Sequence, residues 1–513
     1  MTTLQEFITA LPHPIQNVTA DSRQVKPGSL FVAVSGSAFD GHNFIPQAVA
    51  NGAVAIVGGA RLRRPEIAAP LPYLIVPDAR RALARLSAYL HNFPARQLIM
   101  IGVTGTDGKT TTVNLIHHIL TAAGIRAGMI STVNAVLGQR VESTGLHVTT
   151  PAAPAVQRYL AEMLQAGLTH CVLEATSHGL AQQRVAACDF DVAVVTNITH
   201  EHLDYHGNYP AYRAAKAMLF EGLSSAARKP GQSKTALLNA DDSSFEYLHN
   251  IPAERQISYS LSGPADLVAR QLQLKPDGVT FDLIANNSVL PLCTSLVGRF
   301  NVSNVLAAAG AALALNISPE AIQRGIASVA GVPGRMERID AGQRFTLMVD
   351  FAHTPNALRR AIETGREMAP AGQVITVFGS AGLRDVAKRR LMAQTSARDA
   401  DLTVLTAEDP RTESLAAILA QMAAGCRDGA EGGVEGETFF RIPDRLQAIH
   451  FALTLARPGD IVLVCGKGHE QSMCFGKTEY PWDDRQAAHK ALAAFLAGRP
   501  VPDSGLPTPI LNF

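Results

Sequence analysis

Short apolar runs alternate with amphipathic stretches in the first part of the chain. The runs at 30–36, 53–58 and 73–76 predict strands separated by turns. Between and after them, IPQAVANGA and ARRALARLSAYLHNF carry apolar residues at helical spacing. The pattern therefore predicts a small α/β domain over residues 1–96.

A longer alternation of the same kind follows from residue 97. The buried-type strand LIMIGVTG leads through a glycine-rich turn into the helix TTVNLIHHILTAAG, and THCVLEAT, FDVAVVTNI and KTALLNA predict further strands. The helical stretches between them indicate a mostly parallel sheet with helices on both faces. Residues 255–296 predict a more antiparallel insertion, and we expect this P-loop-type central domain to cover 97–332.

The turn-rich segment GVPGRME at 331–337 predicts a second domain boundary. The later runs TLMVDF, QVITVFG, DLTVLT and DIVLVCG predict four strands of a Rossmann-like domain over 333–513. Its last helix is expected at 484–496, before a tail whose Pro and Gly content argues against regular structure. The predicted fold class is α/β with three domains.

The amino-acid composition argues against several classes of protein. The 45 Lys and Arg nearly balance 44 Asp and Glu, and a net charge of +1 argues against a nucleic-acid-binding protein. The longest apolar run, 305–315, is shorter than the about 18 residues that a membrane span needs. Six scattered cysteines without CxxC spacing argue against a disulfide scaffold or a structural zinc site. Since no basic residue precedes Arg23, we also expect no signal peptide, and predict a cytoplasmic monomer.

A candidate phosphate loop joins the strand that begins the central domain to the following helix. In GVTGTDGKTT, glycines allow a tight turn whose N–H groups, with the helix N-terminus, face phosphate oxygens. Lys109 is expected to neutralise the β and γ phosphates, and the Thr110 hydroxyl to ligate Mg²⁺. Val103 stands where the usual loop has its first glycine, so an ordinary glycine turn is the alternative.

From this loop onward the chain resembles the Mur ligase family, whose members use ATP to join an amine to a carboxylate in peptidoglycan assembly. The family's loop is usually GTNGKTT, and here it is GTDGKTT. The resemblance covers nearly the whole chain through several independent motifs. It implies ATP contacts from the loop residues Gly105, Thr106, Asp107, Gly108, Lys109, Thr110 and Thr111.

Acidic and histidine side chains follow the next strands. Glu174 ends THCVLEAT, and a carboxylate at the carboxyl edge of a parallel strand beside a phosphate loop is well placed to hold Mg²⁺. His200, His202, Asp204 and His206 then fall within one short segment, which lacks a second ligand group for zinc and alone would indicate a polar turn. The resemblance implies that His202 ligates a second Mg²⁺.

Lys216 lies in the amphipathic stretch AYRAAKAMLF. The plain interpretation is a lysine whose stem covers apolar surface. An apolar setting also destabilises the ammonium, and a neutral amine can take up CO₂ to form a carbamate. The resemblance implies that Lys216 is carbamylated and supports the second Mg²⁺.

The resemblance also assigns substrate contacts. It implies that adenosine is bound by Asn301, Arg335 and Asp350. ATP binding would then favour closure of the third domain. Taken alone, Asp350 can also be interpreted as a turn residue. A UDP-N-acetylmuramoyl-dipeptide is expected to contact Ser22, Thr149, Thr150, Thr176, Gln182 and Arg184, with Ser37, Ala38 and Phe39 in a second contact loop. Arg184 suits an anionic group, whereas each hydroxyl can equally cap a turn.

The incoming amino acid is expected at two motifs of the third domain. Where the family member specific for meso-diaminopimelate carries DNPR, this chain has Glu408, Asp409, Pro410 and Arg411. Arg411 and Arg384 suit the extra carboxylate of diaminopimelate, which we favour, whereas Asp409 suits the free ammonium of lysine or ornithine. Gly466 and Glu470 of GKGHE match further contacts to the diamino acid. Charged surface loops are the alternative for this group.

The expected reaction transfers the γ-phosphoryl group of ATP to the D-glutamate carboxylate, and an amine then displaces phosphate. Two Mg²⁺ ions and Lys109 offset the charge between the anions. A folylpolyglutamate or cyanophycin-type ligase, or a catalytically silent nucleotide-binding scaffold, are the alternatives. Retention of Lys109, Glu174, His202 and Lys216 together argues against the scaffold.

Overall fold

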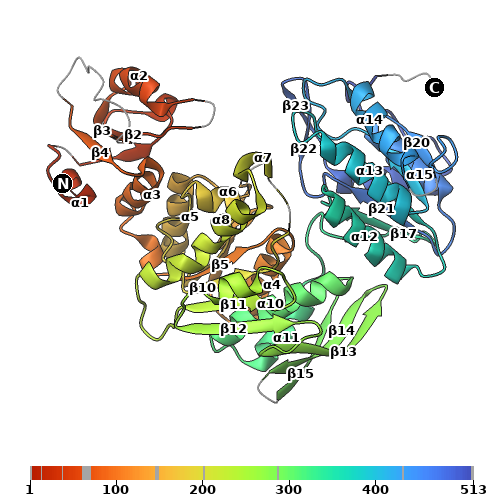
Figure 1. The fold of residues 1–513 in the computed structure, drawn as a ribbon, viewed down its shortest axis with the longest axis horizontal. Coiled ribbons are helices and arrows are strands. Elements are labelled where there is room, and N and C mark those ends of the chain that lie inside the picture. Colours follow the sequence, from red (N-terminus) through yellow and green to blue (C-terminus); the bar gives the residue numbers. More distant parts are fainter. Residues whose placement is uncertain are drawn as a thin grey trace. The chain divides into compact units, whose positions relative to one another are not determined.

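The computed structural model describes residues 3–12, 14–36, 39–59, 71–144, 149–199, 201, 203–285, 288–429 and 432–509, with only the backbone for Leu203 and Asp204. The chain divides into two compact units, Met1–Tyr259 with Ala307–Ser318, and Ser260–Leu306 with Pro319–Phe513 (Figure 1). In the described residues no helix is long and apolar enough to cross a membrane.

The first unit begins with a small parallel sheet in the order β1-β2-β3-β4. Its core is the apolar face of the central strand β2, which is buried along its whole length, packed against α3. The elements are α1 (Leu4–Thr9), β1 (Asn17–Thr19), η1 (Ser22–Gln24), β2 (Ser29–Ala33), η2 (Gly41–Phe44), α2 (Ile45–Ala50), β3 (Ala53–Gly59), β4 (Tyr73–Val76), α3 (Ala79–Leu90) and η3 (Pro94–Arg96).

The larger sheet of this unit runs in the order β12-β11-β10-β5-β9-β6-β7-β8. Its strands are parallel from β12 to β6, and the two short strands β7 and β8 are antiparallel. The elements are β5 (Ile99–Thr104), α4 (Lys109–Ala122), β6 (Ala127–Ile130), β7 (Ala135–Leu137), β8 (Arg140–Glu142), α5 (Ala153–Gln165), β9 (His170–Glu174), α6 (Ser177–Ala181), β10 (Val192–Val195), α7 (Leu203–His206), α8 (Tyr209–Glu221), η4 (Gly222–Ser225), β11 (Thr235–Asn239), α9 (Phe245–His249) and β12 (Arg255–Ser260).

The second unit contains the expected antiparallel insertion, three strands paired in chain order, and a six-stranded sheet in the order β16-β17-β21-β18-β19-β20. In the latter only β16 is antiparallel, and strands β18 and β21 are buried throughout (Figure 1). The insertion and the helices after it are β13 (Leu267–Lys275), β14 (Gly278–Ala285), β15 (Ser288–Thr294), α10 (Arg299–Ala314) and α11 (Pro319–Ala327).

The remaining elements are β16 (Glu337–Ile339), β17 (Thr346–Asp350), α12 (Pro355–Met368), β18 (Val374–Phe378), α13 (Ala387–Asp399), β19 (Leu402–Leu405), α14 (Leu415–Arg427), β20 (Phe439–Arg441), α15 (Arg445–Leu455), β21 (Ile461–Cys465), β22 (Ser472–Phe475), β23 (Thr478–Pro481) and α16 (Asp484–Leu496). The predicted α/β class with a mostly parallel central sheet is confirmed. The domain boundaries near 96 and 332 stay predictions.

Candidate active site

The phosphate loop is the turn between β5 and α4, and the neighbouring strand β10 fixes its shape. Gly105 has φ +153°, and a Cβ there would lie 1.8 Å from Thr196 Oγ1, so no larger residue fits. The N–H groups of Thr106 and Asp107 donate to Asn197 O at 2.7 Å and to Asn197 Oδ1 at 3.0 Å. Both hydrogen bonds go to Asn197, which follows β10, so the conformation of the loop is fixed by a neighbouring segment as well as by its own glycines.

Lys109 opens α4 and folds back over the loop, where its ammonium donates to Thr106 O at 2.7 Å. The side chain of Thr106 meets the hydroxyl of Tyr212, with the two oxygens 2.9 Å apart. The loop therefore presents one lysine charge beside backbone N–H groups at a helix N-terminus, an arrangement suited to a polyphosphate.

Glu174 and Thr110, both expected to hold Mg²⁺, meet at the carboxyl edge of the sheet. The carboxylate is only 1% exposed. Its Oε2 accepts hydrogen bonds from Thr110 Oγ1 at 3.0 Å and from Thr132 N and Oγ1 at 3.0 and 2.9 Å. These hard oxygen donors beside a phosphate loop fit Mg²⁺, which takes few protein ligands and shares phosphate oxygens. Among the described residues there is no group of three or more His, Cys, Asp or Glu that could hold a metal ion, so phosphate oxygens would have to complete this site.

Lys216 is buried in α8 and points at the phosphate loop. Its Nζ donates to Gly105 O at 2.5 Å and lies 4.6 Å from the ring centroid of Tyr212. Burial, and then the nearby charge of Lys109, holds the pKa of the Lys216 ammonium well below its usual range. The neutral, nucleophilic amine is therefore much more accessible at this position than on an exposed lysine.

The histidine segment is described only in part. His200 and His202 lie outside the described residues, as does the side chain of Asp204. The ring of His206 lies 5.4 Å from that of Tyr212 and 5.4 Å from that of His178, centroid to centroid. The described end of this segment thus lies beside Tyr212, one turn of α8 before Lys216.

A second polar cluster joins the start of α6 to the segment before α5. Thr150 Oγ1 donates to Glu174 O at 2.9 Å and lies 3.0 Å from Thr176 Oγ1. Arg184 donates to Thr150 O at 2.6 Å and to Gln182 Oε1 at 2.7 Å, and burial lowers the pKa of its guanidinium. The structure thus brings these four predicted residues together next to the strand that ends in Glu174.

Ser22 lies apart from this cluster, in η1 of the first sheet. Its hydroxyl donates to Gln47 Oε1 at 2.8 Å, so it ties η1 to α2. Phe39 is 75% exposed, whereas Ser37 and Ala38 lie outside the described residues. Thr149 immediately precedes the cluster residue Thr150.

The residues expected around adenosine lie in the second unit. Asn301 is 3% exposed and donates to Val297 O at 2.8 Å. Asp350 accepts from Met336 N and Ala352 N, both at 2.7 Å, so its carboxylate also organises the turn after β17. Next to it, the Arg335 guanidinium lies 4.6 Å from the ring centroid of Phe351.

The two amino-acid motifs meet at the carboxyl ends of β19 and β21. Asp409 Oδ1 accepts from Lys467 Nζ at 3.0 Å and from Cys474 N at 2.9 Å, and Lys467 Nζ lies 2.5 Å from Glu470 Oε2. Lys467 is therefore shared by two carboxylates, and one of them is Asp409, which the sequence suggested for a substrate ammonium. Pro410 follows in the same turn, and Gly382 N donates to Asp409 O at 2.9 Å.

Glu408 differs from its neighbour Asp409 in its hydrogen bonding. It is 7% exposed, and its Oε2 has no hydrogen-bond partner among the described residues. Gly466 has φ +114°, and a Cβ there would lie 2.5 Å from Glu408 Oε2, so glycine leaves room at this oxygen. Burial raises the pKa of the Glu408 carboxyl, while the nearby Lys388 opposes that shift.

Two arginines were also expected to contact the diamino acid. Arg411 has φ 54° and its Nε is buried without a hydrogen-bond partner among the described residues. Arg384 is exposed in the segment between β18 and α13. Among the described residues, Arg411 thus keeps a buried donor that the protein itself does not use, three positions after Glu408.

Sequence reasoning missed several residues that shape the site. Thr132 donates twice to Glu174, and Asn197 binds the phosphate loop. Both follow the carboxyl end of a parallel strand, the position where Glu174 was found, so the same rule applied to β6 and β10 would have indicated them.

Comparison with known proteins agrees with this geometry. Residues 14–91 match the model described as Mur ligase family, catalytic domain, residues 103–312 the Mur ligase middle domain, and residues 334–468 the Mur ligase, glutamate ligase domain. A UDP-N-acetylmuramyl-tripeptide synthetase of Roseiflexus sp. (strain RS-1) is 45% identical over 93% of this chain and 94% of its own.

Two further relatives carry a more specific name. A UDP-N-acetylmuramoyl-L-alanyl-D-glutamate–2,6-diaminopimelate ligase of Geobacillus thermodenitrificans is 43% identical over 92% of this chain and 94% of its own. A solved structure of a ligase with that name has 31% identity and a TM-score of 0.66, and the match covers 97% of this chain and 100% of that one. The chain therefore belongs to the Mur ligase family and is an ATP-dependent, amide-forming ligase.

Proposed function

We propose that this chain adds meso-diaminopimelate to UDP-N-acetylmuramoyl-L-alanyl-D-glutamate in peptidoglycan synthesis. The observation that carries the proposal is the meeting of Lys109, Thr110, Glu174 and Lys216 around one phosphate loop. The names of the relatives support the choice of substrates. Because both ATP and a nucleotide-linked substrate are used, we propose that the reaction takes place in the cytoplasm. We also expect the protein to be a monomer.

The phosphate loop binds the triphosphate through its N–H groups, and Lys109 moves from the Thr106 carbonyl to the phosphate oxygens. Thr110 and Glu174 would hold Mg²⁺, which when bound offsets negative charge between ATP and the substrate carboxylate. The D-glutamate side-chain carboxylate then takes the γ-phosphoryl group, since a free carboxylate is a poor acyl donor. Amine attack on the resulting acyl phosphate forms the amide and releases phosphate.

The muramoyl-dipeptide is proposed to lie along Thr150, Thr176, Gln182 and Arg184. Arg184 is half-buried and its guanidinium is already oriented by Gln182, so little side-chain freedom is lost when it binds an anion. Through Thr150 this cluster is one hydrogen bond from Glu174, close to the proposed metal site. We propose that Ser22 and Thr149 also contact this substrate, and that Asn301, Arg335 and Asp350 bind adenosine.

We further propose that Lys216 carries a carbamate that, with His202, supports a second Mg²⁺. The neutral amine attacks CO₂, one C=O π bond opens as the N–C bond forms, and the proton that leaves the nitrogen goes to water. Burial and the charge of Lys109 both favour the neutral amine that this step needs.

Replacing Lys216 by Ala should lower kcat on the order of a hundred-fold, because it removes a ligand that supports the metal site. Added acetate should restore part of the rate, since a small carboxylate can occupy the space of the carbamate. The rate of ADP release with and without acetate measures this effect. Lys275→Ala, on β13, serves as control and should behave like the unmodified chain. Loss of activity without any rescue by small carboxylates would count against the carbamate.

Selection of the diamino acid is assigned to Glu408 and its neighbours. Glu408 offers a buried carboxylate oxygen without a partner, which suits the distal ammonium of diaminopimelate, and Arg411 with Arg384 suits the distal carboxylate. Because Asp409 already contacts Lys467, we propose that it is less available than Glu408 to the side-chain ammonium of lysine or ornithine. Glu470 and Gly466 complete the contacts in this proposal.

Glu408→Gln should raise KM for diaminopimelate about tenfold or more while leaving KM for ATP unchanged, since it removes one charge-assisted contact. Steady-state kinetics with each substrate varied in turn give the comparison. Glu437→Gln, in the exposed segment before β20, is a matched control. An unchanged KM for diaminopimelate would remove Glu408 from the site.

The whole function is tested by offering the protein ATP, Mg²⁺ and UDP-muramoyl-dipeptide with diaminopimelate, lysine or ornithine. We expect ADP release that depends on both co-substrates, and a product with the mass of the diaminopimelate adduct. Release that follows lysine or ornithine instead would change the amino acid assigned. ATP binding without substrate-dependent release would indicate the silent scaffold.

A further inference from the structure

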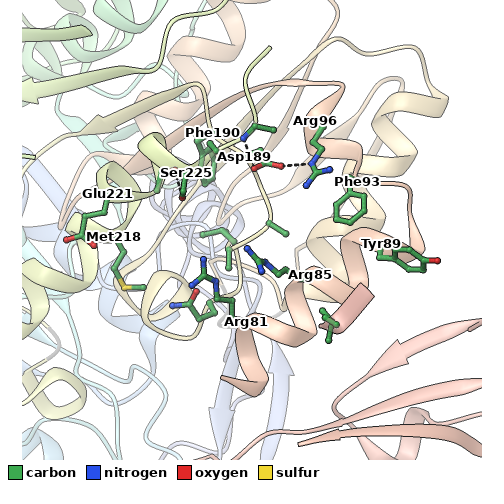
Figure 2. A pocket seen from close by; sticks show the side chains of 18 of the residues that line it. Arg81, Arg85, Tyr89, Phe93, Arg96, Asp189, Phe190, Met218, Glu221 and Ser225 are labelled. Carbon is green, nitrogen blue, oxygen red and sulfur yellow. Dashed lines mark hydrogen bonds and ion pairs between the residues drawn. The ribbon is translucent and has the colours of Figure 1, made fainter. Parts of the chain in front are cut away.

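A cavity with a volume of about 650 Å³ lies in the first unit. Its walls come from α1, α3, the segment between α6 and β10, and the end of α8 with η4 (Figure 2). Arg96 directly precedes β5 and Asp189 precedes β10, whereas the phosphate loop follows β5. The cavity is therefore at the amino ends of the parallel strands, the opposite edge from the phosphate loop.

The cavity has an excess of positive charge. Arg81 and Arg85, one turn apart on α3, point into it side by side (Figure 2). Neither guanidinium has a hydrogen bond or ion pair with any part of the chain that the structure describes. The third arginine, Arg96, is held by Asp189 with Nε 3.3 Å from Oδ2, and Glu221 is the other acid of the lining. Two like charges at this spacing repel, and an anion between them removes that cost.

Apolar side chains form much of the remaining lining. Phe93 lies beside Tyr89, with ring centroids 6.3 Å apart, and Met218 comes from α8 on the other side (Figure 2). Leu180 and Phe190 extend the apolar wall. Ligand sites of about 300–1,000 Å³ typically combine such walls with a few convergent polar groups.

We propose that this cavity binds an organic anion, one that has a phosphate or carboxylate group attached to an apolar or aromatic body. The anionic group lies between the guanidiniums of Arg81 and Arg85, which suit the planar oxygen edge of either group. The apolar body lies against Phe93 and Met218. No residue assigned to ATP or to the muramoyl-dipeptide lines this cavity, although Gln183 of its lining lies between the assigned Gln182 and Arg184.

Isothermal titration of the full chain with naphthyl phosphate tests this site. Naphthol lacks the anion and inorganic phosphate lacks the apolar body, so each should bind roughly tenfold or more weakly than naphthyl phosphate. The double change Arg81→Gln with Arg85→Gln should weaken naphthyl phosphate binding by a similar factor. Because both arginines are exposed on α3, this variant is expected to keep its fold, which thermal unfolding checks.

Two more variants separate this cavity from other sites for the same probe. Arg255→Gln removes an exposed arginine outside the cavity and should leave binding unchanged. Ser225→Trp keeps both arginines but fills the cavity, and should weaken binding. If the double arginine variant binds naphthyl phosphate as tightly as the unmodified chain, or if naphthol binds equally well, the proposal is wrong.

Discussion

Glu174→Gln should lower kcat on the order of a thousand-fold while the protein stays folded. Glutamine keeps an oxygen that can accept the hydrogen bonds from Thr110 and Thr132, so the local structure is expected to persist. It removes the negative charge, and with it the strongest attraction for a divalent cation at this edge of the sheet. The rate of ADP release at increasing Mg²⁺ concentration is the measurement.

Glu246→Gln is the matched control, because Glu246 is an exposed glutamate of α9 in the same unit. It should keep the activity and the melting temperature of the unmodified chain. A Glu174→Gln variant with activity within about threefold of the control would mean that the charge of Glu174 takes no part in the reaction.

Arg445→Met should destabilise the second unit by about 3–5 kcal/mol. Arg445 and Asp484 are both fully buried, and Arg445 Nε and Nη2 donate to the two carboxylate oxygens, each at 2.7 Å. Methionine fills part of the space but leaves the Asp484 charge buried with Trp482 Nε1–H, 2.8 Å away, as one remaining donor. Urea unfolding followed by fluorescence reports on this site directly, because Trp482 is the single tryptophan of the chain.

Arg398→Met provides the comparison for that stability change. Arg398 is half-exposed and pairs with its neighbour Asp399 at 2.7 Å, and such surface pairs contribute about 0–1 kcal/mol. The free energy of unfolding should therefore change little. If Arg445→Met lowers the free energy of unfolding by less than about 1 kcal/mol, the buried ion pair does not contribute strongly to the stability of this unit.

Arg445 also connects the buried ion pair to the proposed amino-acid site. Arg445 also donates to Ala407 O at 3.2 Å and to Cys465 O at 2.7 Å. These carbonyls directly precede Glu408 and Gly466, the residues proposed to meet the diamino acid. The buried pair therefore fixes the two turns on which the selection of the substrate depends.

Local patterns were sufficient for the main features of the fold. The strand, glycine turn and helix around Lys109 were predictable because the apolar run and the glycines act within a few residues. Glu174 followed from the rule that polar residues at the carboxyl ends of parallel strands meet. The short strands β7, β8 and β20 gave no such signal, since three residues show too little periodicity.

Other features depend on residues far apart in the chain. Lys467 lies 58 positions after Asp409, so their pairing arises only when β19 and β21 are folded into one sheet. The sequence therefore offered Asp409 to a substrate ammonium without indicating its contact with Lys467. The role of His202 stays a prediction, because this residue lies outside the described part of the chain.

In the proposed reaction ATP phosphorylates the substrate's carboxylate beside the phosphate loop, and an isotope experiment can follow this step. The step is tested most directly with UDP-muramoyl-dipeptide whose D-glutamate side-chain carboxylate carries heavy oxygen. We expect one labelled oxygen per turnover in the released phosphate, as measured by mass spectrometry. Phosphate without the label, released together with the amide product, would contradict the acyl phosphate and the mechanism built on it.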